Sequence, residues 1–215
     1  MIIKPLKLAS SRREFLQGLF PAGALLSSGC GLLSASSRLQ NKPAKYKFLE
    51  DSGLTMREVF RFAYLSTYIP MMQALADRVG REKLVEMLKE DTDTYWTQWT
   101  RSIAQGLPKK DLAAFFSMDA LEAIIDDIKH RERFWSLANT SQAVENTEKS
   151  YEIRITECLW AQAFREANAG DIGFASICYG DEVMAAAFDQ RLKLTRTKTL
   201  MKGDDCCHFR WVWEG

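Results

Sequence analysis

The fold of this chain is indicated most clearly near its C-terminus, where residues 192–213 read LKLTRTKTLMKGDDCCHFRWVW. Residues 192–201 and 206–213 have the composition of strands. The residues between them, Lys202 to Asp205, include a glycine that can adopt the positive φ of a tight turn. The segment therefore predicts a β-hairpin. It also holds cysteines, a histidine and aspartates, which can act as metal ligands, nucleophiles or proton carriers.

The last of these strands is predicted to have one apolar and one polar face, because alternate side chains of a strand point to opposite sides of the sheet. The apolar face carries Cys207, Phe209, Trp211 and Trp213. The opposite face carries Cys206, His208 and Arg210. In a regular strand Cys207 and His208 cannot hold one metal ion together, whereas Cys206 and His208 could. A β-bulge at the turn would change this assignment.

The first half of the domain is predicted to be helical. Residues 54–106 are rich in helix formers and are interrupted at Pro70, Gly80 and Gly106-Leu107-Pro108, which indicates two or three helices. Apolar residues at helical spacing mark two buried faces, one with Leu84, Val85 and Leu88 and another with Leu121, Ile124, Ile125 and Ile128. The core is expected to include Tyr95, Trp96 and Trp99, with the lining of a pocket as the alternative.

The pattern changes after residue 150. Residues 139–150 are polar and without periodicity, which predicts a loop. Residues 151–156 alternate between apolar and polar side chains, which predicts a strand with one buried face. Two helices are expected between residues 160 and 188. The chain therefore predicts an α+β fold, with an N-terminal helical half followed by a small antiparallel sheet with packed helices.

A thiol and a carboxylate fall within an apolar stripe of the second of these helices. The helical spacing places Phe174, Cys178, Asp181, Ala185 and Phe188 on one face. An ionised carboxylate buried in such a face needs a cation, hydrogen bonds or a bound proton, so Asp181 is a candidate functional residue. The alternative is that Gly180-Asp181 begins a shorter helix and that Asp181 caps it.

Three thiols come from three separate predicted elements. Cys158 ends a strand just before a helix, Cys178 lies on the striped helix and Cys207 lies on the last strand. With His208 or Asp181 as a fourth ligand, these thiols would suit zinc, which takes sulfur and nitrogen ligands in a tetrahedron. The chain has no closely spaced ligand pair of the CxxC or HExxH kind. Buried, inert cysteines are the alternative.

The N-terminus has the pattern of an export signal. The segment Ser11-Arg12-Arg13-Glu14-Phe15-Leu16-Gln17 matches the twin-arginine signal and precedes a modestly apolar run. Leu25-Leu26-Ser27-Ser28-Gly29-Cys30 resembles a lipoprotein cleavage site, with ordinary cleavage near Ser34-Ala35-Ser36 as the alternative to lipidation of Cys30. We expect recognition by the twin-arginine export machinery and a periplasmic or lipid-anchored protein. An amphipathic helix with a chance arginine pair is the other explanation.

Composition supports one domain and argues against a nucleic-acid partner. We assign residues 1–33 to the signal segment, 34–52 to a linker and 53–215 to a single α+β domain. The chain has 29 basic and 28 acidic residues, and removal of residues 1–29 takes away four and one of them, which leaves 25 against 27. A slightly negative protein is not typical of nucleic-acid binders. Membrane attachment is expected only through a lipid on Cys30.

Two stretches carry a resemblance to a known family. Ile177-Cys178-Tyr179-Gly180-Asp181, followed by LTRTKTLMKGDDCCHFR over residues 194–210, resembles the C-terminal half of the L-2-amino-thiazoline-4-carboxylic acid hydrolase family. The resemblance extends over residues 151–213 in sequence, whereas the helical half resembles the family only in the order of its predicted helices. The matching positions are Cys178, Asp181, Arg196, Gly203, Asp204 and Cys207, with Cys158 a looser match. His208 departs from the family pattern, and Cys206 is an extra thiol.

The resemblance implies a hydrolase that opens a small cyclic C=N substrate such as an aminothiazoline carboxylate. It implies Cys178 or Cys207 as nucleophile or metal ligand and Asp181 as acid or base. Arg196 and Asp204 are the implied substrate-binding residues, with Arg196 clamping the substrate carboxylate. A structural ion pair between Arg196 and Asp181 is the alternative.

Two other functions stay open on the sequence alone. The family is similar to the vinyl-reductase-type small-molecule-binding domains, so an exported binding or sensing protein without chemistry is the second hypothesis. The third is a redox-active or disulfide-stapled envelope protein, which predicts pairing among Cys158, Cys178, Cys206 and Cys207.

Overall fold

The computed structural model describes residues 52–122 and 124–215. The predicted signal segment, nearly all of the predicted linker and Cys30 lie outside the described residues. The first half contains α3 (Met56–Phe60), the π-helix η1 (Arg61–Tyr68), α4 (Ile69–Val79), α5 (Arg81–Gly106), α6 (Leu112–Ser117) and α7 (Ile128–Ala138). None of the described helices is long and apolar enough to span a bilayer.

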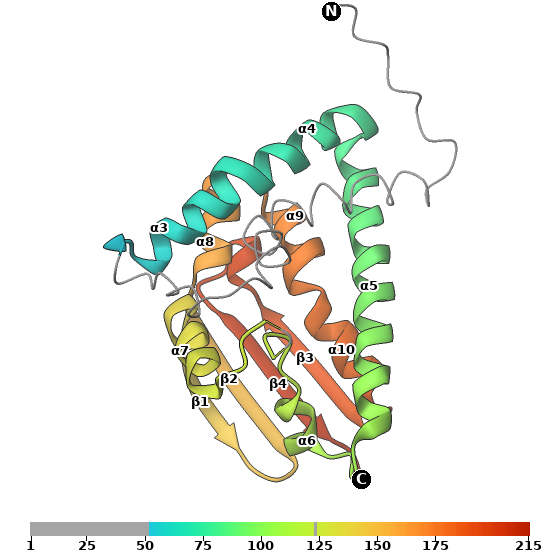
Figure 1. The fold of residues 1–215 in the computed structure, drawn as a ribbon. Coiled ribbons are helices and arrows are strands. Elements are labelled where there is room, and N and C mark those ends of the chain that lie inside the picture. The colour runs from blue at the N-terminus through green and yellow to red at the C-terminus, as the bar shows by residue number, and fades with distance from the viewer. Residues whose placement is uncertain (1–51, 123) are drawn as a thin grey trace, which may run out of the picture. The chain divides into compact units, whose positions relative to one another are not determined.

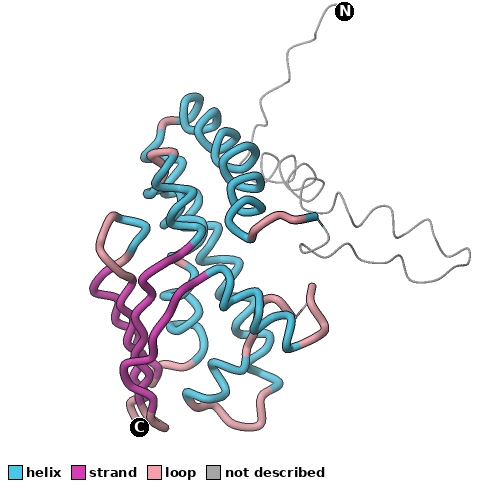
Figure 2. The backbone as a smooth tube through the Cα atoms, turned by 90° about the vertical axis from the view of Figure 1, so that its left-hand side faces the viewer, coloured by secondary structure: helices cyan, strands magenta, loops and turns pink. Residues whose placement is uncertain are grey.

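The second half mixes strands and helices. Its elements are β1 (Asn139–Asn146), β2 (Ser150–Cys158), α8 (Leu159–Glu166), α9 (Gly170–Gly173), the π-helix η2 (Phe174–Cys178), α10 (Gly180–Phe188), β3 (Leu192–Lys198), the 3-10 helix η3 (Leu200–Lys202) and β4 (Cys207–Trp213). The strands form one antiparallel sheet in the order β1-β2-β4-β3. The described helices lie mainly on one side of this layer (Figure 1, Figure 2). The predicted α+β fold is confirmed.

The C-terminal hairpin is also confirmed. Strands β3 and β4 pair antiparallel, and Gly203 in the connection takes a φ of 104°. The predicted apolar face of β4 is buried, and its alternate residues His208 and Arg210 are more accessible. Cys206 departs from the prediction, because it precedes the strand and is buried as well. Strand alternation does not extend to a residue in the turn.

Residues 139–150, predicted as a loop, contain the whole of the edge strand β1, so that prediction is wrong. Among the described strands, β1 pairs with β2 alone, and its side chains are mostly exposed. An edge strand with little buried surface has no need for alternating apolar residues, and two register shifts against β2 weaken any periodicity further.

The predicted helix through residues 121–128 is absent, although α7 begins at its last residue. Ile124 is 79% exposed and Ile128 is 59% exposed, so their spacing marks no buried face. The carboxylate of Asp119 accepts a hydrogen bond from the Leu121 amide at 2.9 Å, and that of Asp127 accepts one from Lys129 at 2.8 Å. Such local bonds favour turns and helix starts over a continuous helix.

The helix breaks at Gly80 and Gly106 are confirmed, and near Pro70 the helix changes from η1 to α4 without an intervening loop. Pro70 lies at the start of α4, directly after η1. The wider π-turn and the first turn of a helix both tolerate a residue without an amide hydrogen. Tyr95 is 56% exposed and is therefore not a core residue.

Candidate active site

Cys178 lies at the end of η2, where a π-turn interrupts the run of helix from α9 to α10. The Tyr179 amide donates to the Phe174 carbonyl at 2.8 Å, one residue further back than in an α-helix. Side chains from neighbouring elements donate hydrogen bonds to other backbone carbonyls of this segment. Thr92 Oγ1 donates to the Ala175 carbonyl at 2.9 Å, and Arg196 Nη1 donates to the Cys178 carbonyl at 3.0 Å. Packing of α5 and β3 thus stabilises the π-turn.

Arg196 joins the sheet to this helical segment. Its Nη1 lies 3.2 Å from Asp181 Oδ2, and its Nη2 lies 2.6 Å from Glu182 Oε1. Only 3% of its side chain is exposed. The guanidinium carbon also lies 4.8 Å from the centre of the Phe174 ring and 5.2 Å from that of Phe209. The structure therefore shows the ion pair that was the alternative to a substrate clamp.

A shorter helix does begin at Gly180, as the alternative predicted, but Asp181 lies in the first turn of α10 and makes no capping hydrogen bond there, so its predicted role as a cap is wrong. Its carboxylate pairs with Arg196, and 37% of its side chain stays exposed. The surrounding protein atoms disfavour the charged form and raise the pKa of Asp181 to about 6. The positive charge of Arg196 lowers this pKa, but by less than burial raises it, and the negative charge of Glu182 raises it further.

We expect Asp181→Asn to change how stability depends on pH. The folded-state pKa of about 6 exceeds the ordinary 3.8, so between these values the folded state binds more protons and the wild type loses stability as pH rises. The variant should lack this loss. Urea unfolding at intervals from pH 4 to pH 7 measures it. Asp189→Asn is the flat control, because Arg191 lowers the pKa of Asp189 to about 2, and the pH dependence of that group therefore lies mainly below pH 4. A constant difference between Asp181→Asn and wild type across this range would contradict the prediction.

The described cysteines are free, so the structure contains none of the disulfides of the third hypothesis. Cys158, Cys178 and Cys207 are near enough for each thiol's charge to affect another. Burial raises the pKa of all three, that of Cys158 to about 11. Asp181 raises the pKa of Cys178 further. These thiols are therefore protonated at neutral pH in the unliganded protein.

Cys207 and Asp204 hold the turn between β3 and β4. The Leu200 amide donates to Cys207 Sγ at 3.3 Å, and the thiol donates to Thr199 Oγ1 at 3.7 Å. The Thr199 amide donates to Asp204 Oδ2 at 2.7 Å. The side chains of Cys207 and Asp204, both predicted site residues, are thus hydrogen-bonded to the turn itself. They fix the position of Leu200, which lines a pocket.

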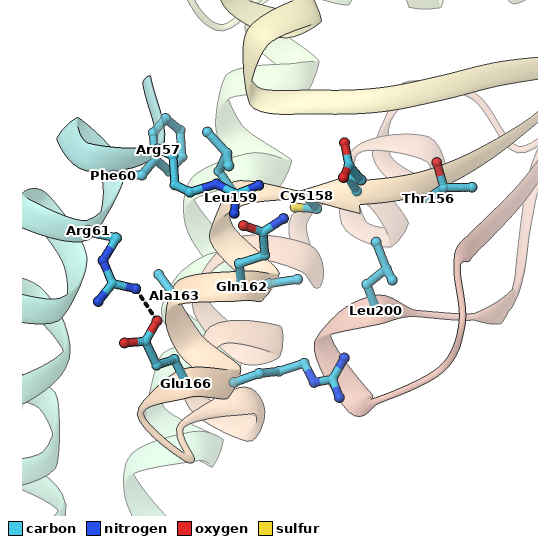
Figure 3. Close-up of a pocket in the computed structure, with 13 residues that line it drawn as sticks. Arg57, Phe60, Arg61, Thr156, Cys158, Leu159, Gln162, Ala163, Glu166 and Leu200 are labelled. Carbon is cyan, nitrogen blue, oxygen red and sulfur yellow. Dashed lines mark hydrogen bonds and ion pairs between the residues drawn. The ribbon is translucent and has the colours of Figure 1, made fainter. Parts of the chain in front are cut away.

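A pocket of about 690 Å³ lies between α3, η1, α8 and the end of β2 (Figure 3). Of the predicted site residues, only Cys158 lines it; Cys178, Asp181, Arg196, Asp204 and Cys207 do not. Its other polar lining residues are Arg57, Arg61, Thr156, Glu157, Gln162, Arg165 and Glu166. Arg61 pairs with Glu166 across it. In Figure 3 the Cys158 sulfur lies in the same space as the side chains of Arg57 and Gln162.

A family model described as L-2-amino-thiazoline-4-carboxylic acid hydrolase matches residues 57–211, which is most of the chain. The chain belongs to this family. The match extends over the helical half as well as the sheet, and it begins at a pocket arginine, Arg57. No curated protein matches the chain.

For this member of the L-2-amino-thiazoline-4-carboxylic acid hydrolase family, the predicted set of metal ligands does not form one site. His208 lies on the far face of β4 from Cys207, with Nε2 at 2.8 Å from Glu152 Oε1 and Nδ1 at 2.9 Å from Thr197 Oγ1. Within residues 52–122 and 124–215, no group of three or more His, Cys, Asp or Glu side chains could hold a metal ion. Strand alternation excludes His208 from a site with Cys207, because it places the imidazole and the thiol on opposite sides of the sheet.

The sequence interpretation missed the pocket arginines and Gln162. One signal for part of this set is the spacing along α8, where Cys158, Gln162 and Arg165 recur at the interval that places them on one helix face. Arg57 and Arg61 carry no comparable signal, because their approach to α8 depends on how the first helices fold back across the domain.

Proposed function

We propose that this protein is a hydrolase that opens a small cyclic C=N substrate carrying a carboxylate, similar to L-2-amino-thiazoline-4-carboxylate. The observation that carries the proposal is a pocket that combines the Cys158 thiol with guanidinium groups from α3 and α8, in a member of this hydrolase family. Guanidinium groups bind carboxylates, and a thiol can attack an amidine carbon.

Cys158 has a suitable position for a nucleophile. It precedes the first residue of α8, and the amides of Trp160 and Ala161 lower its pKa, although by less than burial raises it. A cationic amidine bound next to the thiol would lower this pKa further and favour the thiolate in the complex. The thiolate would form a bond to the amidine carbon, and the bond from that carbon to the ring sulfur would break, which gives a free substrate thiol and an isothiourea on Cys158. Water would then add to the same carbon and displace the Cys158 thiol, so that the product is a urea and the enzyme is restored.

Asp181 and Cys178 lie behind Cys158 rather than in the pocket, so we assign them positioning and electrostatic roles. The Asp181 charge raises the pKa values of both Cys158 and Cys178. Protonation of Asp181 therefore favours the thiolate of Cys158, and its tie to Arg196 holds α10 against the sheet.

Turnover of substrate pairs tests this function. Purified protein is incubated with L-2-amino-thiazoline-4-carboxylate and with 2-aminothiazoline, which lacks the carboxylate, and the released thiol is measured. We expect a kcat/KM at least about tenfold higher for the carboxylate, since one charge-assisted contact supplies this much. Arg57→Gln should reduce that preference, whereas Arg154→Gln, on the outer face of the sheet, should not. Absence of ring opening with both compounds would contradict the proposal.

A non-enzymatic binding protein is the second candidate. It is favoured by one observation, the raised pKa of every thiol near the pocket, which makes the resting cysteines unreactive. Saturable binding of the aminothiazoline carboxylate by calorimetry, without product release over hours, would select this candidate.

We further propose that the protein is exported through the twin-arginine machinery and retained in the periplasm or by a lipid on Cys30. The arginine pair at Arg12-Arg13 and the apolar run after it support this proposal. Replacement of Arg12-Arg13 by two lysines, followed by cell fractionation, tests it.

A further inference from the structure

The pocket is larger and longer than a small ring with one carboxylate requires. Its volume of about 690 Å³ lies within the range of pockets that enclose drug-sized ligands. It also follows the length of α8, because residues from Cys158 at the N-terminal end to Glu166 at the C-terminal end line it. A small ring placed at Cys158 would leave the far end to water.

The far end carries a cation that the family reaction does not need. Arg165 lies about 10 Å further along α8 than Cys158, at a rise of about 1.5 Å per residue. It lines the same pocket, and its guanidinium approaches Gly203 in the turn after η3. Its side chain is exposed, and no ion pair involves it among the described residues. This differs from Arg61, whose charge is neutralised by Glu166.

Arg57 provides the second cation, at the opposite end. Figure 3 shows its side chain near Leu159 and Gln162, at the end of the pocket that holds the Cys158 thiol. Within residues 52–122 and 124–215, Arg57 has no ion-pair partner either. Two cations without a carboxylate partner thus stand at the two ends of one elongated pocket.

We propose that the natural ligand of this pocket carries two anionic groups, one held by Arg57 beside the reacting carbon and a second held by Arg165 about two helical turns away. The second group is a carboxylate or a phosphate. The inference rests on the proposed function for the position of the reacting carbon, and it extends the substrate class to an elongated amidine with two acidic ends.

Calorimetry with simple diacids on the full chain tests the inference. Suberate is long enough to approach both arginines, octanoate has the same chain with one carboxylate, and malonate has two carboxylates too close together. We expect suberate to bind at least about tenfold more tightly than either. Arg165→Gln should reduce this advantage to about twofold or less, and Arg57→Gln should weaken suberate and malonate alike. Arg154→Gln, which removes an exposed guanidinium from the outer face of β2, is the matched control.

A second compound, 7-phosphonoheptanoate, has the same six methylenes as suberate between its acidic groups and distinguishes a phosphate from a carboxylate as the second group. Tighter binding than suberate would indicate a phosphate, and weaker binding that still exceeds octanoate would indicate a carboxylate. Equal affinities for suberate, octanoate and malonate, or an advantage that survives Arg165→Gln, would overturn the inference. If the protein binds suberate tightly but opens no aminothiazoline ring, the proposed hydrolase function is overturned and the two-anion ligand is not. If it opens the ring but shows no preference for long diacids, the two-anion ligand is overturned and the hydrolase function is not.

Discussion

Replacement of Cys158 with alanine is expected to reduce kcat/KM for L-2-amino-thiazoline-4-carboxylate by roughly 10³-fold or more, because it removes the nucleophile and leaves only binding and orientation. Cys158 lines the pocket and directly precedes α8, whereas Cys178 and Cys207 do not line the pocket. The measurement is steady-state ring opening by wild type and variant. The melting temperature of each protein shows whether the fold is preserved.

Two controls separate loss of chemistry from loss of structure. Cys206→Ala removes another buried thiol that does not line the pocket, and it should keep kcat/KM within about twofold of wild type. Cys158→Ser keeps the volume of the side chain and replaces the thiol with a much weaker nucleophile, so it should be nearly as inactive as Cys158→Ala. Near-normal turnover by Cys158→Ala would show that Cys158 is not the nucleophile and would favour direct attack by water.

Arg196→Met is expected to lower the free energy of unfolding by about 2–4 kcal/mol. The substitution keeps much of the apolar packing between Phe174 and Phe209 but leaves three acceptors without their donor. These acceptors are the carboxylates of Asp181 and Glu182 and the carbonyl of Cys178. Both carboxylates are partly exposed, so water compensates some of the loss, and the lower part of the range for a broken buried ion pair applies.

Arg210→Met is the matched control for Arg196→Met. Arg210 lies on the neighbouring strand and also contacts two carboxylates, those of Glu145 at 3.3 Å and Glu152 at 3.4 Å, but 45% of its side chain is exposed. We expect a cost below about 1 kcal/mol for this exposed network. Urea unfolding followed by far-UV circular dichroism measures both variants. Equal costs for the two would show that burial of Arg196 adds nothing to its ion pairs.

The hairpin and the burial of one face of β4 could be predicted because their causes are local. A glycine at positive φ, a period of two and a row of aromatic residues act within one segment of chain. The same is true of helix ends at Gly80 and Gly106. Strand β1 could not be found this way, because an edge strand is defined by its partner β2 and not by its own side chains.

Of the candidate site, the sequence predicted that Cys158, Cys178, Cys207 and Asp181 lie together, with an ion pair between Arg196 and Asp181 as one alternative for Arg196. The structure confirms a contact between Asp181 and Arg196 and proximity among the thiols. The functions predicted for Cys178, Cys207 and Asp204 stay predictions, and their observed contacts are structural. Alternation predicted that His208 cannot share a metal ion with Cys207, and its contact with Glu152 on the opposite face agrees with that prediction.

By itself the sequence determined the α+β fold class, the hairpin with its buried thiol and the family, because each depends on residue types at fixed short spacings. Only the tertiary structure decided which of these residues meets a ligand. Helices α3 and η1 carry Arg57 and Arg61 to the side of α8, roughly a hundred residues further along the chain, and their packing there leaves the pocket beside Cys158. Contacts between residues so far apart are set by how whole faces pack, and spacing within a segment does not report them.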